Sequence, residues 1–415
     1  MKETPSNARI DANRLWSRLM ELARIGATEV PGEVNRQALS AEDAEACALL
    51  LGWAAEAGME PSFDSAGNLF LTLTGNEPDL TPVLCGSHLD SQPTGGRFDG
   101  ALGVLAALEA ATALAADQRR RRSLVVVAWS TEEGGRFAPG MTGSSAFAGA
   151  RSVQSIRQQR DADGTSLGEA LDSFLARFET ISRKPIGFPV ADYLELHIEQ
   201  ADQLEACSRV IGSVTGIQGK KTWEIRISGS EAHAGTEPMT RRKDALQAFI
   251  RMARALYEAM TSAGAMFTIG RLDVKPNAPS VVPAEVRFRM DLRHADRATL
   301  DRLGGLVEQL VSAGAPPCDV QIQRLVNAPP NAFDPGLRKG ILAAAERLGH
   351  PAMEVLSAAG HDARHLAGVT RAGMVFVPCR GGLSHHPDEW TEPDHAAAGA
   401  AVLLEVLEDL LGREG

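Results

Sequence analysis

Imidazole and carboxylate side chains recur where short apolar segments of this sequence end. The positions that share this placement are His88, Asp90, Asp99, Glu132, Glu133, His197 and His385. A donor set of nitrogen and oxygen without thiolate suits zinc, manganese, cobalt or nickel at a catalytic site better than a structural zinc. One catalytic metal needs three protein ligands and an open position, so five ligands fit two metals that share a carboxylate. The five candidate ligands are His88, Asp99, Glu133, His197 and His385.

The elements that would position these side chains alternate between apolar strands and longer helices. They are strands at Thr81–Cys85, Ser123–Trp129, Tyr193–Leu196 and Met374–Val377 and a helix at Gly100–Ala115. The run Leu124–Val127 is apolar on both faces, which is typical of a buried parallel strand. Open α/β sheets place their sites at the carboxyl ends of such strands. We therefore expect the candidates to meet at one edge of a mostly parallel sheet with helices on both sides, a three-layer α/β domain.

The middle of the chain changes rhythm and predicts a second domain. Its strands and helices follow in β-α-β-β-α-β order at Thr222–Ile227, Asp244–Met260, Met266–Val274, Glu285–Leu292, Arg297–Val311 and Asp319–Leu325. This order is typical of a ferredoxin-like α+β unit. Residues 215–328 would then be inserted into a larger domain made of residues 1–214 and 329–415. Two domains also suit 415 residues, which exceed what one hydrophobic core usually organises.

Composition disfavours several classes of partner. A net charge of −11 argues against nucleic acid, because phosphate binding needs a concentrated basic face. The one basic run, Arg119–Arg122, is interpreted as a solvated loop ahead of a strand. Five scattered cysteines indicate neither a disulfide framework nor a thiolate zinc site. The polar N-terminus predicts no signal peptide, and the longest apolar stretch is too short to span a membrane. We therefore expect a cytoplasmic protein.

Signatures of other catalytic mechanisms are missing from the sequence. The pattern G-x-S-x-G does not occur, so a nucleophile elbow is not predicted. Neither G-x-G-x-x-G nor G-x-x-x-x-G-K-[ST] occurs, so the glycines of dinucleotide and P-loop sites are lacking. A single histidine near a strand end is more often a hydrogen-bonded core residue than a ligand. The recurrence of suitable side chains at several strand ends is what favours a metal site here.

Read in order, the segments around these residues resemble the hydantoinase/carbamoylase branch of the M20 metallopeptidase and amidase family. The segments that carry the resemblance are Gly86–Ser91, Gly95–Gly100, Glu132–Gly134, Arg136–Pro139, Glu195–Gln200, Thr215–Gly219, His233–Thr236, Pro238–Met239, Gly360–Ala363 and Gly382–His385. The resemblance runs from about residue 10 to the C-terminus. It implies a catalytic domain with an inserted domain that serves as a lid and as the interface of a homodimer.

The resemblance also assigns the metal ligands. His88, Asp99 and His197 would bind one divalent ion, and Asp99, Glu133 and His385 would bind the other. Each subunit would then hold two ions, zinc or manganese, with cobalt and nickel as alternatives. Asp90 would orient His88 by a hydrogen bond, as ligating histidines usually require.

Catalytic and substrate-binding roles follow from the same resemblance. Glu132 would be the general base, and His233 would polarise the scissile carbonyl. Arg293 would bind a substrate carboxylate with two parallel hydrogen bonds. Further substrate-contact candidates are Gln200, Asn277 and Ser280. Instead of binding substrate, Arg293 could be an ordinary charged residue at the end of a strand. His361, which lies in one of the resembling segments, could serve only as a structural hydrogen-bonding residue.

Three positions depart from the family pattern. Ser280 stands where the family usually has asparagine, and Ala201–Asp202 stands where it usually has Gly-Pro. Both departures bear on substrate identity rather than on the chemistry. His386 directly follows His385 and is an alternative ligand.

The implied activity is hydrolysis of a C–N bond in a linear ureido or amide compound that carries a carboxylate. An N-carbamoyl amino acid would yield ammonia, carbon dioxide and the amino acid. Allantoate is the main alternative substrate, and an M20 aminoacylase or dipeptidase acting on a linear amide is another. A catalytically inactive ligand-binding protein on the same scaffold would have lost Glu132 or a metal ligand, and the sequence retains them all.

Overall fold

The computed structural model describes residues 9–413, and these residues form two compact units. One unit contains the chain up to residue 216 together with the residues from 332 onward. The other unit is the single continuous segment 217–331. Among the described residues, no helix combines the length and the apolar character that crossing a membrane would require.

The first unit is built on a ten-stranded mixed sheet. Its strands are β1 (Glu60–Phe63), β2 (Leu69–Leu73), β3 (Val83–His88), β4 (Leu124–Trp129), β5 (Ser182–Arg183), β6 (Asp192–Ile198), β7 (Ile211–Ile217), β12 (Asn331–Ala332), β13 (Ala352–Ser357) and β14 (Arg371–Val377). They lie in the order β12-β7-β14-β6-β3-β4-β2-β1-β5, and β13 pairs with β7. The four central strands β14, β6, β3 and β4 run parallel to one another. These strands overlap the four strands predicted around the candidate ligands, and the mostly parallel sheet is confirmed.

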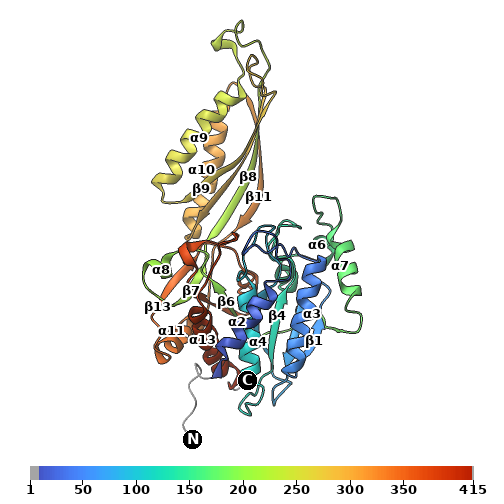
Figure 1. Cartoon of the computed structure of the whole chain (residues 1–415). Helices are drawn as coiled ribbons and strands as arrows, with labels where there is room; N and C mark the ends of the chain where they lie inside the picture. Colours follow the sequence, from blue (N-terminus) through green and yellow to red (C-terminus); the bar gives the residue numbers. More distant parts are fainter. Residues whose placement is uncertain (1–8, 414–415) are drawn as a thin grey trace. The chain divides into compact units, whose positions relative to one another are not determined.

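Helices cover both faces of this sheet. The helices of the unit are α2 (Ala12–Leu22), α3 (Ala41–Glu56), α4 (Ala101–Leu114), α5 (Thr142–Phe147), α6 (Val153–Ile156), α7 (Leu167–Ala176), α8 (Gln203–Ala206), α11 (Pro335–Arg347), α12 (Ala363–Leu366) and α13 (Pro393–Leu411), with a 3₁₀ turn η2 at Arg380–Gly382. On one face, α4 and α13 pack together over the central strands. On the other face, Phe147 of α5 packs against Trp129 of β4. The domain therefore has the expected three layers (Figure 1).

Alternation along β4 shows why both faces are filled. Leu124 and Val126 belong to the large core beneath α4, whereas Trp129 points to the opposite face. There the indole of Trp129 donates a hydrogen bond to the hydroxyl of Tyr193 in β6, at 2.9 Å. A strand with apolar residues on both faces can be stable only when it is covered twice.

The basic run ahead of β4 differs from its interpretation as a solvated loop. Arg120 is only 8% exposed, and its guanidinium donates hydrogen bonds to the carbonyls of Leu114 and Thr74. Arg121 forms an ion pair with Glu77. The run therefore ties the end of α4 to the segment after β2, and Arg120 is a buried structural residue.

The second unit is a four-stranded antiparallel sheet with two helices on one face (Figure 1). Its elements are β8 (Gly219–Ser228), η1 (Met239–Arg241), α9 (Ala245–Ser262), β9 (Met266–Lys275), β10 (Glu285–His294), α10 (Arg297–Gly314) and β11 (Asp319–Ala328). The strand order β11-β8-β10-β9 is that of a ferredoxin-like fold. Val286, Phe288 and Met290 of β10 are buried in one core with the helices, as their alternation predicts.

Candidate metal centre

The carboxyl ends of the four parallel strands bring the predicted ligands of the first unit together. His88 is the last residue of β3, and His197 is the residue before the end of β6. Glu132 and Glu133 follow β4, and His385 lies on the loop after β14. The sequence placed His88 beyond its strand, but the pairing of β3 with β4 extends to His88 opposite Trp129. The strand begins two residues later and ends three residues later than the predicted Thr81–Cys85, and all of its residues are buried.

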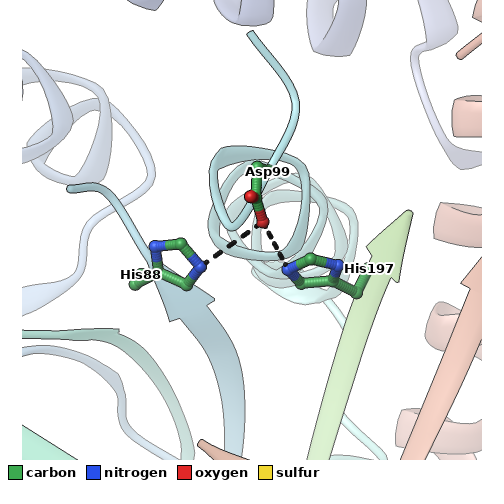
Figure 2. Close-up of side chains that lie close together, drawn as sticks. All are labelled: His88, Asp99 and His197. Atoms are coloured by element: carbon green, nitrogen blue, oxygen red, sulfur yellow. Dashed lines mark ion pairs between the residues drawn. The ribbon is translucent and has the colours of Figure 1, made fainter. Parts of the chain in front are cut away.

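One donor group contains His88, Asp99 and His197 (Figure 2). The Nε2 atom of His197 lies 3.0 Å from Oδ1 of Asp99, and the Nε2 atom of His88 lies 3.7 Å from the same oxygen. All three side chains are buried. Their donor atoms lie within 4.8 Å of one another, a spacing that one metal ion could bridge.

A second donor group contains Asp99, Glu133 and His385. The Nε2 atom of His385 lies 3.1 Å from Oδ2 of Asp99 and 3.3 Å from Oε2 of Glu133. Asp99 therefore belongs to both groups and turns one oxygen toward each of them. His386 points instead toward Asp388, with Nδ1 3.8 Å from Oδ2.

Both buried histidines present the same ring nitrogen to Asp99. Nδ1 of His88 is hydrogen-bonded to the backbone carbonyl of Asp90 at 2.9 Å, and Nδ1 of His197 to the carbonyl of Ile198 at 2.8 Å. A neutral imidazole that donates from Nδ1 keeps its lone pair on Nε2, the form that binds metal.

Asp90 lies next to Nδ1 of His88 with two oxygens: its backbone carbonyl is hydrogen-bonded to this nitrogen at 2.9 Å, and its carboxylate Oδ1 lies 3.7 Å away. The carboxylate also accepts hydrogen bonds from the backbone amides of Glu132 and Glu133, both at 3.1 Å. Asp90 therefore positions the two glutamates after β4 as well as His88.

Glu132 lies beside the first donor group without belonging to either group. Its Oε2 atom lies 3.7 Å from Nε2 of His88. Burial raises the pKa of its carboxyl well above the usual value, and the charges of Asp362 and Glu133 add to this effect against the opposing charge of His88. A buried carboxylate that stands next to the ligands but is not one of them is suited to accept and return a proton.

Electrostatics at the shared carboxylate favour a bound cation. Burial opposes ionisation of Asp99, but hydrogen bonds from His197, His385 and His88 hold its pKa well below the usual value. Hydrogen bonds to Asp99 and Glu133 raise the pKa of His385 to about 11. The histidines and the carboxylates of the two donor groups therefore stabilise each other's charged forms.

The residues present fit a pair of divalent metal ions. All the donor atoms are nitrogen or oxygen, the histidine Nε2 atoms converge on a carboxylate, and that carboxylate offers one oxygen to each group. This is the donor chemistry of catalytic two-metal sites.

Gly100 allows Asp99 to approach His88. Its φ of +64° lies in the left-handed region, and a Cβ atom there would lie 2.4 Å from the His88 ring. Only glycine fits between the shared carboxylate and the helix that follows it.

The remaining predicted site residues lie on the second unit, apart from Gln200. His233 pairs with Val281 in a short antiparallel bridge, and the amide of Ala234 donates to the carbonyl of Ser280 at 3.0 Å. Asn277 precedes this bridge and has a positive φ of 56°. Arg293, near the end of β10, donates from Nε to Oδ1 of Asp291 at 2.9 Å. His233, Asn277 and Ser280 are thus on neighbouring exposed loops of the second unit.

Gln200 contacts the donor groups directly. Its side-chain amide donates to Oδ2 of Asp99 at 3.1 Å and to the hydroxyl of Ser384 at 2.9 Å. The sequence suggested a substrate contact for Gln200, and no pattern indicated that it would hydrogen-bond a ligand.

Sequence reasoning missed the part played by several buried polar residues around the ligands. Glu195, Tyr193 and Ser87 form one hydrogen-bonded set that no sequence pattern indicated. His361 forms a hydrogen bond with Ser357, the structural role that the sequence analysis gave for it, and its ring packs edge-on against His197. Glu195, His197 and His361 also lie close enough to hold an ion. However, both oxygens of Glu195 already accept hydrogen bonds, from Ser87, Tyr193 and the amide of Ala363. We therefore interpret Glu195 and His361 as structural neighbours of His197 and not as ligands of a further metal ion.

The chain is similar to known proteins over almost its whole length. Residues 84–409 match Peptidase family M20/M25/M40. The N-carbamoyl-L-amino-acid amidohydrolase of Rhizobium meliloti is 40% identical over 412 residues, which cover 96% of each chain. The allantoate amidohydrolase of Bacillus subtilis is 32% identical over 397 residues, covering 93% of this chain and 94% of its own. Among solved structures, an amidase of the hydantoinase/carbamoylase family from Burkholderia multivorans is 39% identical, with a TM-score of 0.87 and coverage of 98% and 99%.

Proposed function

The chain belongs to Peptidase family M20/M25/M40, and we propose from this membership that it hydrolyses the ureido C–N bond of an N-carbamoyl amino acid. The observation that carries the proposal is the position of Asp99, which offers one carboxylate oxygen to each of two donor groups. Glu132 lies beside them. Such a site suits attack by water on a carbonyl that bears a leaving nitrogen.

The reaction would divide between the metal ions and the side chains of the chain. Two divalent ions bound by these ligands would supply an acidic water molecule and polarise the scissile carbonyl. Zinc and manganese are the proposed ions, with cobalt or nickel as alternatives. Glu132 accepts a proton from the attacking water and returns it to the departing nitrogen. The C–N bond breaks, ammonia leaves, and the remaining carbamate decomposes to carbon dioxide and the amino acid.

The second unit would complete the substrate site. We assign residues 215–328 as a lid and dimerisation domain, with residues 1–214 and 329–415 as the catalytic domain. His233 would stabilise the developing oxyanion, and Arg293 would bind the substrate carboxylate. Asn277, Ser280 and Gln200 are proposed as additional substrate contacts. Five unpaired cysteines support a reducing compartment, the cytoplasm.

Allantoate is the second candidate substrate, because an allantoate amidohydrolase is among the relatives that align over almost the whole chain. It carries the same ureido and carboxylate groups. A serine at position 280, where the family usually has asparagine, bears on the choice between these substrates.

Ammonia release from a substrate panel tests the proposal. The panel contains N-carbamoyl α- and β-amino acids and allantoate, with N-acyl amino acids scored by release of the free amino acid. Zinc, manganese or cobalt is added to separate samples. We expect turnover of a ureido acid, with little activity on N-acyl compounds. Activity confined to N-acyl amino acids would identify an aminoacylase instead.

Arg293 gives a prediction for substrate binding. Lysine cannot reproduce the planar fork of a guanidinium, so Arg293→Lys is expected to lower kcat/KM for carboxylated substrates about tenfold or more. The melting temperature should change little. Arg289→Lys is a matched control, since Arg289 is on the same strand and forms an ion pair with Glu224. Equal effects of the two substitutions on kcat/KM would contradict the assignment.

Subunit cooperation gives a second prediction. The family resemblance implies that His233 reaches the active site of the partner subunit in a homodimer. If it does, mixing inactive His233→Ala chains with inactive Glu132→Gln chains should restore activity. In a mixed dimer, one site would carry both lesions and the other neither. We would measure ammonia release after subunit exchange, with exchange proven by differential tagging. Without recovered activity, His233 would act within its own chain or have no catalytic role.

A further inference from the structure

The histidine ligands of the two donor groups are held by different kinds of structural element. His88 and His197 lie within strands, and both side chains are almost fully buried. His385 lies on a loop with a positive φ of 55°, and its side chain is 45% exposed. The geometry of the second group therefore depends on whatever holds this loop against Asp99.

Glu389 is the residue that connects the two segments. It is 2% exposed although it follows an exposed stretch of loop. Its Oε1 atom accepts hydrogen bonds from the backbone amides of Phe98 and Asp99, at 2.9 and 3.0 Å. Its Oε2 atom accepts a hydrogen bond from the hydroxyl of Ser384 at 2.9 Å. One carboxylate thus holds the segment of the shared ligand and the residue before His385.

Further contacts converge on the same oxygen of Asp99. Gln200 donates to Oδ2 of Asp99 and to Ser384, whose hydroxyl also lies 3.4 Å from Oδ2. This is the oxygen that faces His385, at 3.1 Å. We name Glu389, Ser384 and Gln200 together the Asp99 clamp. The clamp bears on the second donor group, since Oδ1 faces the first.

Gly96 leaves room for the clamp. A Cβ atom at this position would lie 2.2 Å from the carboxyl carbon of Glu389. The φ of Gly96 is not in the left-handed region, but the added Cβ would also lie 2.4 Å from Cβ of Glu389. Gly96→Ala would therefore displace Glu389, both its carboxylate and the start of its side chain, without replacing any residue of the clamp.

We propose that Glu389 is a positioning residue that keeps the second donor group (Asp99, Glu133 and His385) able to bind its metal ion. Replacing Glu389 would then release the ion of the second group and leave the ion of the first group bound. The inference rests on the proposed two-metal function. The first group would survive because its histidines are fixed by β3, β6 and the backbone carbonyls of Asp90 and Ile198. Partners of metal ligands commonly change metal affinity by about 10–100-fold when removed.

Metal stoichiometry measured at equilibrium tests this proposal. The wild-type chain and the variants Glu389→Ala, Ser384→Ala and Gly96→Ala are dialysed against a zinc buffer, and bound zinc is measured by elemental analysis. We expect two ions in the wild type and a loss of one ion in each variant, with affinity for that ion reduced about 10–100-fold. Glu389→Gln should keep both ions, because its amide oxygen still accepts from the two backbone amides and its nitrogen can donate to Ser384.

Glu109→Ala is the control for loss of a buried carboxylate. Glu109 is 1% exposed on α4 and forms an ion pair with Arg14. The substitution Glu109→Ala should lower the melting temperature measured without metal. It should not change the number of zinc ions bound after dialysis against the zinc buffer.

Each outcome decides. Retention of two ions with unchanged affinity in Ser384→Ala and Gly96→Ala would overturn the proposal, and so would equal loss of both ions. If Glu389→Ala fails to fold, these two variants decide alone. A wild-type chain that binds a single ion would instead overturn the two-metal function on which the inference rests.

Discussion

Replacing Glu132 by glutamine is expected to lower kcat by at least about 10²-fold while the chain keeps its metal ions. Glutamine has nearly the same shape as glutamate but cannot accept the proton of the attacking water. Glu132 belongs to neither donor group, and its backbone amide is held by Asp90 whatever the side chain is. Loss of activity without loss of metal is the signature of a residue that moves a proton.

The matched control is its neighbour. Glu133→Gln removes a donor of the second group, so it should lower both activity and metal content. The measurement is the initial rate of ammonia release, paired with elemental analysis of the same dialysed samples. If metal is lost from Glu132→Gln and retained by Glu133→Gln, the roles of the two glutamates are reversed.

Residues whose positions follow from strand ends could be anticipated from the sequence. Parallel strands that are apolar on both faces can be recognised from their composition, and their carboxyl ends lie at one edge of the sheet. This rule places His88 and His197 at the same edge of the sheet, and the pairing of β3 with β6 brings them close together. The position of Asp99 could also be anticipated, because it directly precedes the helix predicted at Gly100–Ala115. The register and the exact ends of the strands could not be predicted from the sequence, because they depend on how neighbouring strands pair. Pairing of β3 with β4, for example, extends to His88.

Contacts that depend on loop conformation could not be anticipated. No periodicity marks Glu389, which lies in a polar segment that resembles a solvated turn. The hydrogen bond from His88 to the carbonyl of Asp90 is invisible in the sequence, since any residue has a carbonyl. The choice between His385 and His386 is made by the conformation of their loop, in which His385 faces Asp99 and Glu133 whereas His386 faces Asp388.

The missed secondary structure has a similar cause. The short helices α5, α6 and α8 and the strands β7 and β13 contain too few turns or alternations to give a clear pattern. In contrast, α9 and α10 span 18 residues each, and their apolar positions repeat on one face over several turns. Long periodic elements are therefore predictable, and the short ones are fixed by tertiary packing.

Removal of divalent metal is expected to abolish turnover, and its replacement to restore it. The five proposed ligands all offer nitrogen or oxygen atoms, and the two metal ions they would hold are expected to supply the acidic water molecule and to polarise the carbonyl. The test is dialysis against a chelator, followed by ammonia assays before and after addition of zinc, manganese or cobalt. Full activity in a sample shown to be free of metal would contradict the two-metal function.

Metal binding to the stripped chain should also release protons. Without metal, hydrogen bonds to Asp99 and Glu133 raise the pKa of His385 to about 11, so its ring is protonated at neutral pH. A metal ion requires the neutral ring, and one proton must leave as the second ion binds. Competition from protons weakens as pH rises, so the apparent affinity for that ion should increase with pH up to about 11.

Calorimetry in buffers of different ionisation enthalpy measures the number of protons released, and titrations at several pH values measure the affinity. His386→Gln is the control, because His386 points toward Asp388 and should not change the proton count. His385→Gln removes both the proton and a donor of the second group, so it should abolish this release together with the second binding event. An affinity for the second ion that does not change with pH would show that His385 is already neutral before the ion binds, and that the carboxylates of Asp99 and Glu133 do not hold a proton on its ring.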